Sequence, residues 1–320
     1  MDSAARTQGP AAAGSGDSPQ GGPAAGGAES WRHEFVQANG VRLHYVRQGQ
    51  GFPLLLVHGW PEFWRTWRKI IAPLARSYDV IAYDLRGFGM SEKPAGEALE
   101  SYTLEHHIQD LAALVDTLGL QKVGLVSHDS GANIAQGYAR MRPERVGGLF
   151  FFDCPYPGIG RRWADAEVVR ESWYQYFNQL PWTAQWLTER RENCEKYLRY
   201  CLDHWCHVPG TFDSDLDAWV DNYMQPGNMQ GGFNWYKAMQ AFREGLIRDG
   251  APEMPPIRVP ARIRWGASDP VLLPGFGDRL GDYFSDFDFK VVEGAGHFVA
   301  FERPDYAVAE ILDFFGGLGL

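Results

Sequence analysis

The sequence is poor in cysteine, with four in 320 residues, and no two of them form a Cys-X-X-Cys pair. A chain of this length can bury enough apolar surface to fold without disulfides, so we expect reduced thiols and a cytoplasmic protein. Residues 201–207 combine two cysteines with two histidines, but their spacing matches no common zinc pattern. We therefore expect no metal site.

Long basic runs and long apolar runs are also missing. Lys and Arg total 30 against 40 Asp and Glu, a formal net charge of −10, so no basic stretch is present to bind nucleic acid. No apolar run reaches membrane-spanning length, and the start of the chain lacks the patterns of a secretory signal or a transit peptide. The first 30 residues contain 8 Ala, 7 Gly, 4 Ser and 3 Pro, a composition that predicts a disordered tail.

From residue 31 onward, short apolar runs alternate with segments of helical periodicity. The expected strands are 34–37, 41–46, 53–57, 80–83, 122–126, 148–152, 261–265 and 289–292, and the expected helices are 64–76, 103–118, 130–141, 275–284 and 304–315. This order predicts an α/β fold with a mostly parallel, doubly wound sheet. The alternation stops over 154–259, a helical and aromatic-rich stretch. We expect it to form a lid, inserted after the sixth strand of a core made of residues 31–153 and 260–320.

The segment Ser-His-Asp-Ser-Gly at residues 127–131 directly follows an apolar run. A sharp turn from strand to helix crowds the positions two before and two after its apex, and only a turn centred on Asp129 has small residues at both. A carboxylate nucleophile forms an alkyl ester, which restricts the substrate to an electrophilic sp3 carbon such as that of an epoxide or an alkyl halide. The alternative is that Asp129 simply caps the helix that follows.

A nucleophilic aspartate needs a base to activate water and an acid to orient that base. His297 lies between glycines and Phe298 in the loop after the last expected strand, and Asp269 lies in the loop after the strand before it. Along the chain the order is nucleophile, acid, histidine, which is the usual order where a strand-to-helix turn of this kind carries the nucleophile. The backbone N–H groups of Ser130 and Trp60 are the expected oxyanion donors, and a cis Trp60-Pro61 peptide would turn the Trp60 N–H inward.

These motifs resemble those of epoxide hydrolases of the α/β-hydrolase superfamily. The resemblance spans residues 31–320 and includes His-Gly-Trp-Pro-Glu-Phe-Trp at 58–64 and Asp-Leu-Arg-Gly-Phe-Gly-Met-Ser at 84–91, besides the Asp129 turn and the His297 loop. It implies an apolar epoxide converted to a vicinal diol, without a cofactor, through an ester on Asp129 that His297-activated water hydrolyses. Haloalkane and haloacid dehalogenases share these motifs.

The resemblance also implies two lid tyrosines that protonate the epoxide oxygen. Tyr236 lies in a segment similar to the one that carries the first. The second belongs in residues 173–179, where an ungapped alignment places Trp173 at the expected position and Tyr174 fits after a shift of one residue, with Tyr176 as the alternative. We expect Trp173, Tyr176 and His128 to contact substrate.

Three other functions remain open from the sequence. A dehalogenase would use the same three residues, although haloalkane dehalogenases usually carry Trp where Ser130 stands, and residues 130–133 contain no arginine to bind a haloacid. A receptor could retain the fold without catalysis. A serine esterase would act through Ser130, which would force His128 into the crowded part of the turn.

Overall fold

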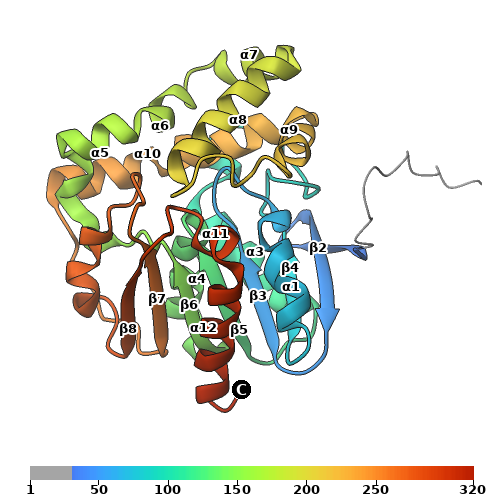
Figure 1. Cartoon of the computed structure of the whole chain (residues 1–320), viewed down its shortest axis with the longest axis vertical. Helices are drawn as coiled ribbons and strands as arrows, with labels where there is room; N and C mark the ends of the chain where they lie inside the picture. Colours follow the sequence, from blue (N-terminus) through green and yellow to red (C-terminus); the bar gives the residue numbers. More distant parts are fainter. Residues whose placement is uncertain (1–30) are drawn as a thin grey trace, which may run out of the picture. The chain divides into compact units, whose positions relative to one another are not determined.

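The computed structural model describes residues 31–320, and the expected tail lies outside the described residues. An eight-stranded sheet with the order β1-β2-β4-β3-β5-β6-β7-β8 runs through this part of the chain (Figure 1). The antiparallel pairs are β1 with β2 and β2 with β4, and the remaining neighbours are parallel. The strands are β1 His33–Ala38, β2 Val41–Gly49, β3 Pro53–Val57, β4 Asp79–Tyr83, β5 Val123–His128, β6 Val146–Phe152, β7 Ala261–Gly266 and β8 Phe287–Val292.

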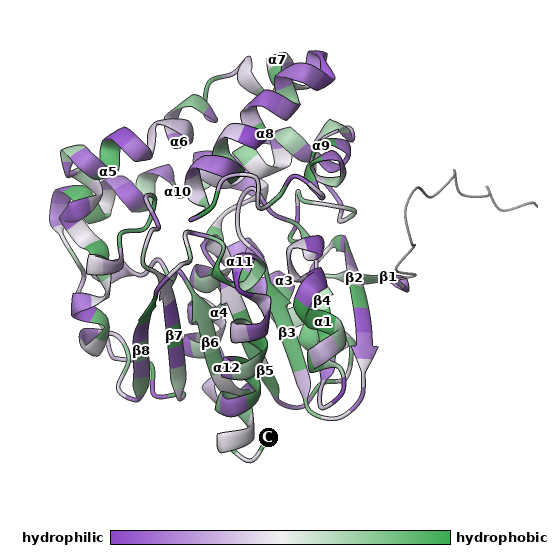
Figure 2. Cartoon of the chain, viewed as in Figure 1, coloured by the Kyte–Doolittle hydropathy of each residue, from purple (hydrophilic) through white to green (hydrophobic). Residues whose placement is uncertain are grey.

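The central strands are apolar because helices cover both faces of the sheet. Every residue of β4 and β5 is buried, whereas the edge strand β8 has exposed residues along most of its length. Figure 2 shows the same gradient, with green central strands and more purple at β8. Around the sheet lie α1 Arg68–Leu74, α2 Ala98–Ser101, α3 Leu104–Thr117, α4 Ser130–Met141, α11 Val299–Glu302 and α12 Pro304–Gly317, with the 3-10 helices η1 Trp64–Trp67, η2 Pro143–Arg145 and η4 Pro274–Asp282.

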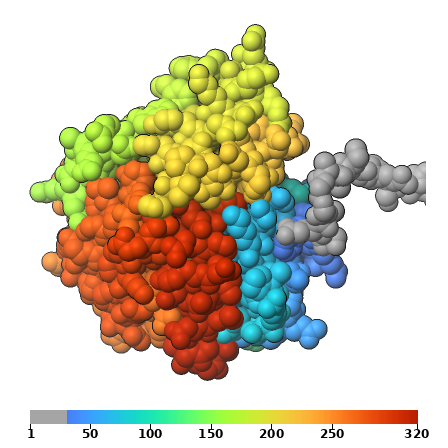
Figure 3. Space-filling view, in the orientation of Figure 1, coloured from blue at the N-terminus to red at the C-terminus, as the bar shows by residue number. Residues whose placement is uncertain are grey.

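The chain between β6 and β7 forms the helical lid that the sequence predicts after the sixth strand. It contains η3 Pro157–Ala164, α5 Ala166–Glu171, α6 Trp173–Phe177, α7 Thr183–Glu189, α8 Arg191–Trp205, α9 Leu216–Met224 and α10 Asn228–Asp249. These helices gather over one end of the sheet (Figure 1), and the space-filling view shows them directly against the C-terminal part of the chain (Figure 3). Among the described residues, no helix is long and apolar enough to cross a membrane.

The predicted α/β architecture is confirmed, and the differences from the expected elements are local. The helix expected over 275–284 is the 3-10 helix η4, and the one expected over 64–76 divides into η1 and α1. Strand β5 continues two residues beyond the expected 122–126 and ends at His128, directly before Asp129. Thr103 caps α3 as expected, because its side chain accepts a hydrogen bond from the His106 N–H.

Candidate active site

Asp129 stands alone between β5 and α4 with φ 47° and ψ −127°. Positive φ is rare for a residue with a side chain and is retained where the surrounding structure requires it. The carboxylate makes no capping hydrogen bond to α4, so the interpretation of Asp129 as a helix cap is wrong. The turn therefore presents this carboxylate away from the helix.

The turn is too crowded for larger neighbours. A Cβ at Gly131 would lie 2.3 Å from the Val57 carbonyl oxygen, and a Cβ at Gly59 would lie 2.6 Å from the Asp129 Cβ. The close approach at Gly131 is the one that the sequence predicts for a turn centred on Asp129. Ser127, the other flanking residue, is fully buried.

The loop after β3 delivers a hydrogen-bond donor to the carboxylate. The Trp60-Pro61 peptide is cis, as predicted, and the Trp60 N–H donates to Asp129 Oδ2 at 3.0 Å. Ser130 begins α4 next to Asp129, so its backbone N–H is among those that a helix leaves unpaired at its N-terminus. The Ser130 hydroxyl is buried and has no hydrogen-bond partner in the described part of the chain, so no base is present to activate it.

His297 and Asp269 form a buried pair. His297 Nδ1 lies 2.8 Å from Asp269 Oδ2, while Asp269 Oδ1 accepts hydrogen bonds from the Val271 and Leu272 N–H groups at 2.8 and 2.9 Å. Burial by itself lowers the pKa of His297, but the Asp269 carboxylate, followed by Asp129 and Glu62, outweighs burial and raises that pKa to about 9. The acid thus fixes the ring orientation and favours its protonated form.

A second carboxyl group, which the sequence analysis missed, lies beside this pair. Asp153 directly follows β6 with φ 43°, and its Oδ1 accepts a hydrogen bond from the Gly266 N–H at 2.8 Å. Burial and then the neighbouring Asp269 hold the pKa of Asp153 well above its ordinary value. Asp153 therefore favours its protonated, uncharged form more than an ordinary aspartate does. An acid placed directly after a parallel strand was the available sequence signal.

His128 does not line the substrate cavity, contrary to expectation. Its Nδ1 lies 2.7 Å from Glu62 Oε2 and its Nε2 lies 2.7 Å from the His297 carbonyl oxygen. Burial by itself raises the pKa of Glu62, but the facing His128 outweighs it and lowers that pKa to about 2. Glu62 also accepts the Gly59 N–H at 2.7 Å, so this pair links the His297 loop to the loop that carries Trp60.

The two expected tyrosines meet under the lid. The ring of Tyr174 (α6) stacks on Trp60 with centroids 5.2 Å apart and an interplanar angle of 9°, and it meets Tyr236 (α10) edge to face at 5.7 Å. Burial raises the pKa of both phenols, and the Asp129 carboxylate raises it further. Both tyrosines therefore keep their protons at neutral pH and can donate them.

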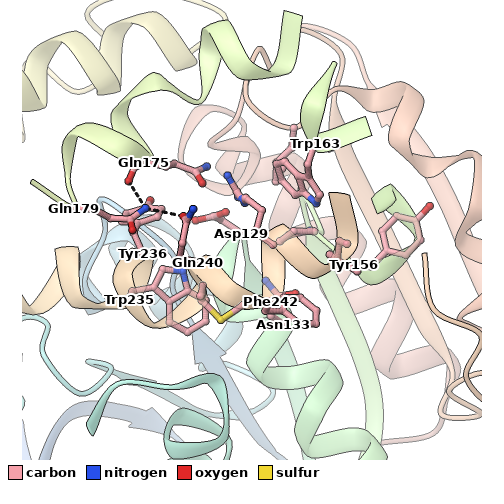
Figure 4. Close-up of a pocket in the computed structure, with 15 residues that line it drawn as sticks. Asp129, Asn133, Tyr156, Trp163, Gln175, Gln179, Trp235, Tyr236, Gln240 and Phe242 are labelled. Carbon is pink, nitrogen blue, oxygen red and sulfur yellow. Dashed lines mark hydrogen bonds between the residues drawn. The ribbon is translucent and has the colours of Figure 1, made fainter. Parts of the chain in front are cut away.

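A cavity of about 620 Å³, its open mouth included, lies between the turn and the lid. Asp129 and Tyr236 line it, together with Asn133, Pro155, Tyr156, Trp163, Gln175, Gln179, Trp235, Met239, Gln240, Phe242, Arg243, Leu246 and Leu272. Figure 4 shows Gln179 hydrogen-bonded to Gln175 and to Gln240 within this lining.

Trp173 and Tyr176 do not belong to this lining. These residues are 39% and 45% exposed, whereas Tyr174 is buried. The register shifted by one residue, which selects Tyr174, is therefore the one that the structure brings to Tyr236. No group of His, Cys, Asp and Glu side chains among residues 31–320 could hold a metal ion.

Comparison with known proteins places this geometry in a family. The alpha/beta hydrolase fold family model matches residues 53–304. A soluble epoxide hydrolase from Corynebacterium sp. is 31% identical over 293 residues, which covers 89% of this chain and 98% of that protein. Human epoxide hydrolase 4 is 29% identical and covers 84% of this chain and 74% of that protein.

Solved structures are similar over the same part of the chain. An epoxide hydrolase solved without ligand has a TM-score of 0.78 at 29% identity, and covers 90% of this chain and 100% of that one. A Bacillus megaterium epoxide hydrolase in complex with an inhibitor also has a TM-score of 0.78, at 26% identity, and covers 88% of this chain and 100% of that one. By these matches, the chain belongs to the alpha/beta hydrolase fold family.

Proposed function

We propose that the protein is an epoxide hydrolase that converts a small, largely apolar epoxide to a vicinal diol. The observation that carries this proposal is the Asp129 carboxylate at a strained turn, near two buried and protonated phenols, Tyr174 and Tyr236. Opening an epoxide requires a nucleophile that attacks carbon and a donor that protonates the oxygen. Relatives named epoxide hydrolases support the same activity.

In the first half-reaction, Asp129 attacks an epoxide carbon from the side opposite its oxygen. The new C–O bond forms the ester while the ring C–O bond breaks, and Tyr236 or Tyr174 transfers its proton to the departing oxygen. The phenols suit this task because the alkoxide that develops is strongly basic. The tyrosinate regains its proton from water.

In the second half-reaction, His297 takes a proton from water, and the resulting hydroxide adds to the carbonyl carbon of the ester. The Trp60 N–H, which already lies at the Asp129 carboxylate, and the Ser130 N–H bind the oxyanion. Collapse releases the diol, whose oxygen takes the hydroxyl proton of the intermediate, and restores the Asp129 carboxylate. The proton held by His297 neutralises the hydroxide that was left when water reprotonated the tyrosinate. Because the ester has no charge, its formation removes one of the causes that raise the pKa of His297, and so favours the neutral ring that can accept a proton from water.

We propose residues 31–153 and 260–320 as the core that supplies nucleophile and base, and residues 154–259 as the cap that supplies the phenols. The described part of the chain forms one compact unit from Arg32 to Leu320, so the two would act as one body. The four free, buried cysteines fit a reducing compartment, which supports a cytoplasmic location.

Mass spectrometry of the intact protein tests the proposal. His297→Gln should form the ester without hydrolysing it, so exposure to a panel of epoxides, haloalkanes and haloacetates should add the mass of a whole epoxide. Asp129→Asn is the matched control and should gain nothing. An adduct equal to a halide minus HX would make the protein a dehalogenase, and no adduct with any compound would favour a binding function.

A further inference from the structure

Arg243 lies in the active-site cavity and has no role in the reaction described above. It belongs to α10, seven residues beyond Tyr236, and lines the same cavity as Tyr236 and Asp129. Seven residues are two helical turns, so Arg243 lies on the same face of α10 as Tyr236, about 10.5 Å farther along the axis. Helical side chains lean toward the N-terminus, which directs Arg243 back toward Tyr236.

The guanidinium group has no anionic partner within residues 31–320. Its Cζ lies 4.1 Å from the centroid of the Trp163 ring, and no described residue forms a hydrogen bond or an ion pair with it. The buried Arg86 and Arg264, by contrast, are bound by the carboxylates of Asp110 and Glu310. An arginine keeps its charge even when partly buried, so Arg243 presents unused N–H donors inside a site for small molecules.

Charge in the cavity is otherwise sparse. Among the described residues of the lining, Asp129 is the only carboxylate. Burial lowers the pKa of Arg243, whereas the nearby Tyr174, Tyr236, Tyr176 and Asp129 raise it. An anionic substrate would be repelled by Asp129 alone, and Arg243 offsets that repulsion. The lining also contains apolar side chains, which suit the body of such a substrate: Pro155, Trp163, Met239, Phe242, Leu246 and Leu272.

We propose that the substrate is an epoxide with a carboxylate at the far end of an apolar body, and that Arg243 binds this carboxylate. The planar guanidinium fork matches a carboxylate with two parallel hydrogen bonds. The spacing of Arg243 and Tyr236 on α10 then sets the length of the substrate. This inference rests on the proposed epoxide hydrolase activity and adds to it the class of epoxide.

Straight-chain acids with a terminal epoxide, compared with their methyl esters, test the proposal. We expect kcat/KM to favour the acid over the ester and to peak at one chain length. Arg243→Gln should lower the ratio of acid to ester on the order of 10- to 100-fold, the usual worth of hydrogen bonds to a charged group, and mainly through KM. Arg248→Gln is the matched control, because Arg248 is exposed on the same helix and pairs with Asp249. It should keep the preference of the wild type.

The outcomes separate this inference from the proposed function. Two results would overturn the carboxylate site and leave the proposed epoxide hydrolase activity intact. The wild-type protein could hydrolyse the esters as well as the acids at every chain length, or Arg243→Gln could leave the ratio of acid to ester kcat/KM unchanged. A folded wild-type protein that hydrolyses neither series, and whose His297→Gln variant forms no epoxide adduct, would overturn both.

Discussion

At the scale of single residues, two buried carboxyl groups next to the His297 loop have different tasks. Asp269 accepts a hydrogen bond from the His297 ring, whereas Asp153, whose pKa burial raises, accepts the Gly266 N–H. Asp269→Asn should lower kcat on the order of 10⁴-fold, because the amide cannot stabilise the imidazolium or fix its orientation. Asp153→Asn is the matched variant. It keeps an oxygen that can accept the Gly266 N–H and should change kcat far less. Steady-state kinetics would contradict us if both losses were equal.

His297 should also make stability depend on pH. Its pKa in the folded protein is about 9 against 6.5 for an ordinary histidine, so the folded state binds the proton more tightly than the unfolded chain. The resulting stabilisation is fully present below pH 6.5 and is lost as pH rises through about 9. The difference in unfolding free energy between wild type and His297→Gln, measured in urea, should therefore shrink over this range. A difference that grows with pH would contradict the assignment.

At the scale of secondary-structure elements, the lid helices α6 and α10 matter because each brings one phenol to the same place. In the proposed reaction either phenol can donate the proton, so Tyr174→Phe and Tyr236→Phe should each lower the rate of ester formation in part. The double variant should lose on the order of 10²- to 10⁴-fold, more than the product of the single losses. Tyr176→Phe changes an exposed tyrosine of the same short helix and is the control. Single-turnover kinetics would contradict the shared role if the effects were simply multiplicative.

The elements show what sequence reasoning could and could not predict. Apolar runs such as Leu54–Val57 are buried on both faces, so these runs located the central strands, and the motifs that follow them indicated Asp129, Asp269 and His297. The lid residues were harder, because α6 has only five residues and packing, not pattern, decides which of them face inward. One residue is about 100° of rotation on a helix, which separates the buried Tyr174 from the exposed Trp173.

At the scale of the whole molecule, the lid and the core are joined at the loop that carries His297, the proposed base. The His297 N–H donates to the Trp205 carbonyl oxygen at 2.7 Å, which ties the end of α8 to the core. Glu302 reinforces this junction, because its carboxylate accepts the N–H groups of His207 at 2.7 Å, Gly296 at 2.9 Å and Phe298 at 3.1 Å. The end of α8 and the His297 loop therefore share one anchor.

We expect Glu302→Gln to loosen this anchor. An amide can accept on one side only, so its NH2 group would face one of the three N–H donors without forming a bond. The loss should destabilise the protein by about 1.5–3 kcal/mol, measured by urea unfolding, and lower kcat because the His297 loop shifts. Glu144→Gln, an exposed exchange of the same kind, is the control. An unfolding midpoint equal to that of the wild type would show that the anchor contributes nothing.

The four buried cysteines can report on local opening of the structure. Cys154 follows β6 and lies beside Gln136 of α4, whereas Cys194, Cys201 and Cys206 lie on or directly after α8, and all are buried. Burial raises the pKa of these thiols, so a thiol reagent modifies them only when the structure around them opens. Because the end of α8 is tied to the His297 loop, we expect the four to be labelled together, in a single kinetic step. Three fast labels followed by a slow fourth would instead reveal a lid that unfolds on its own while the sheet stays intact.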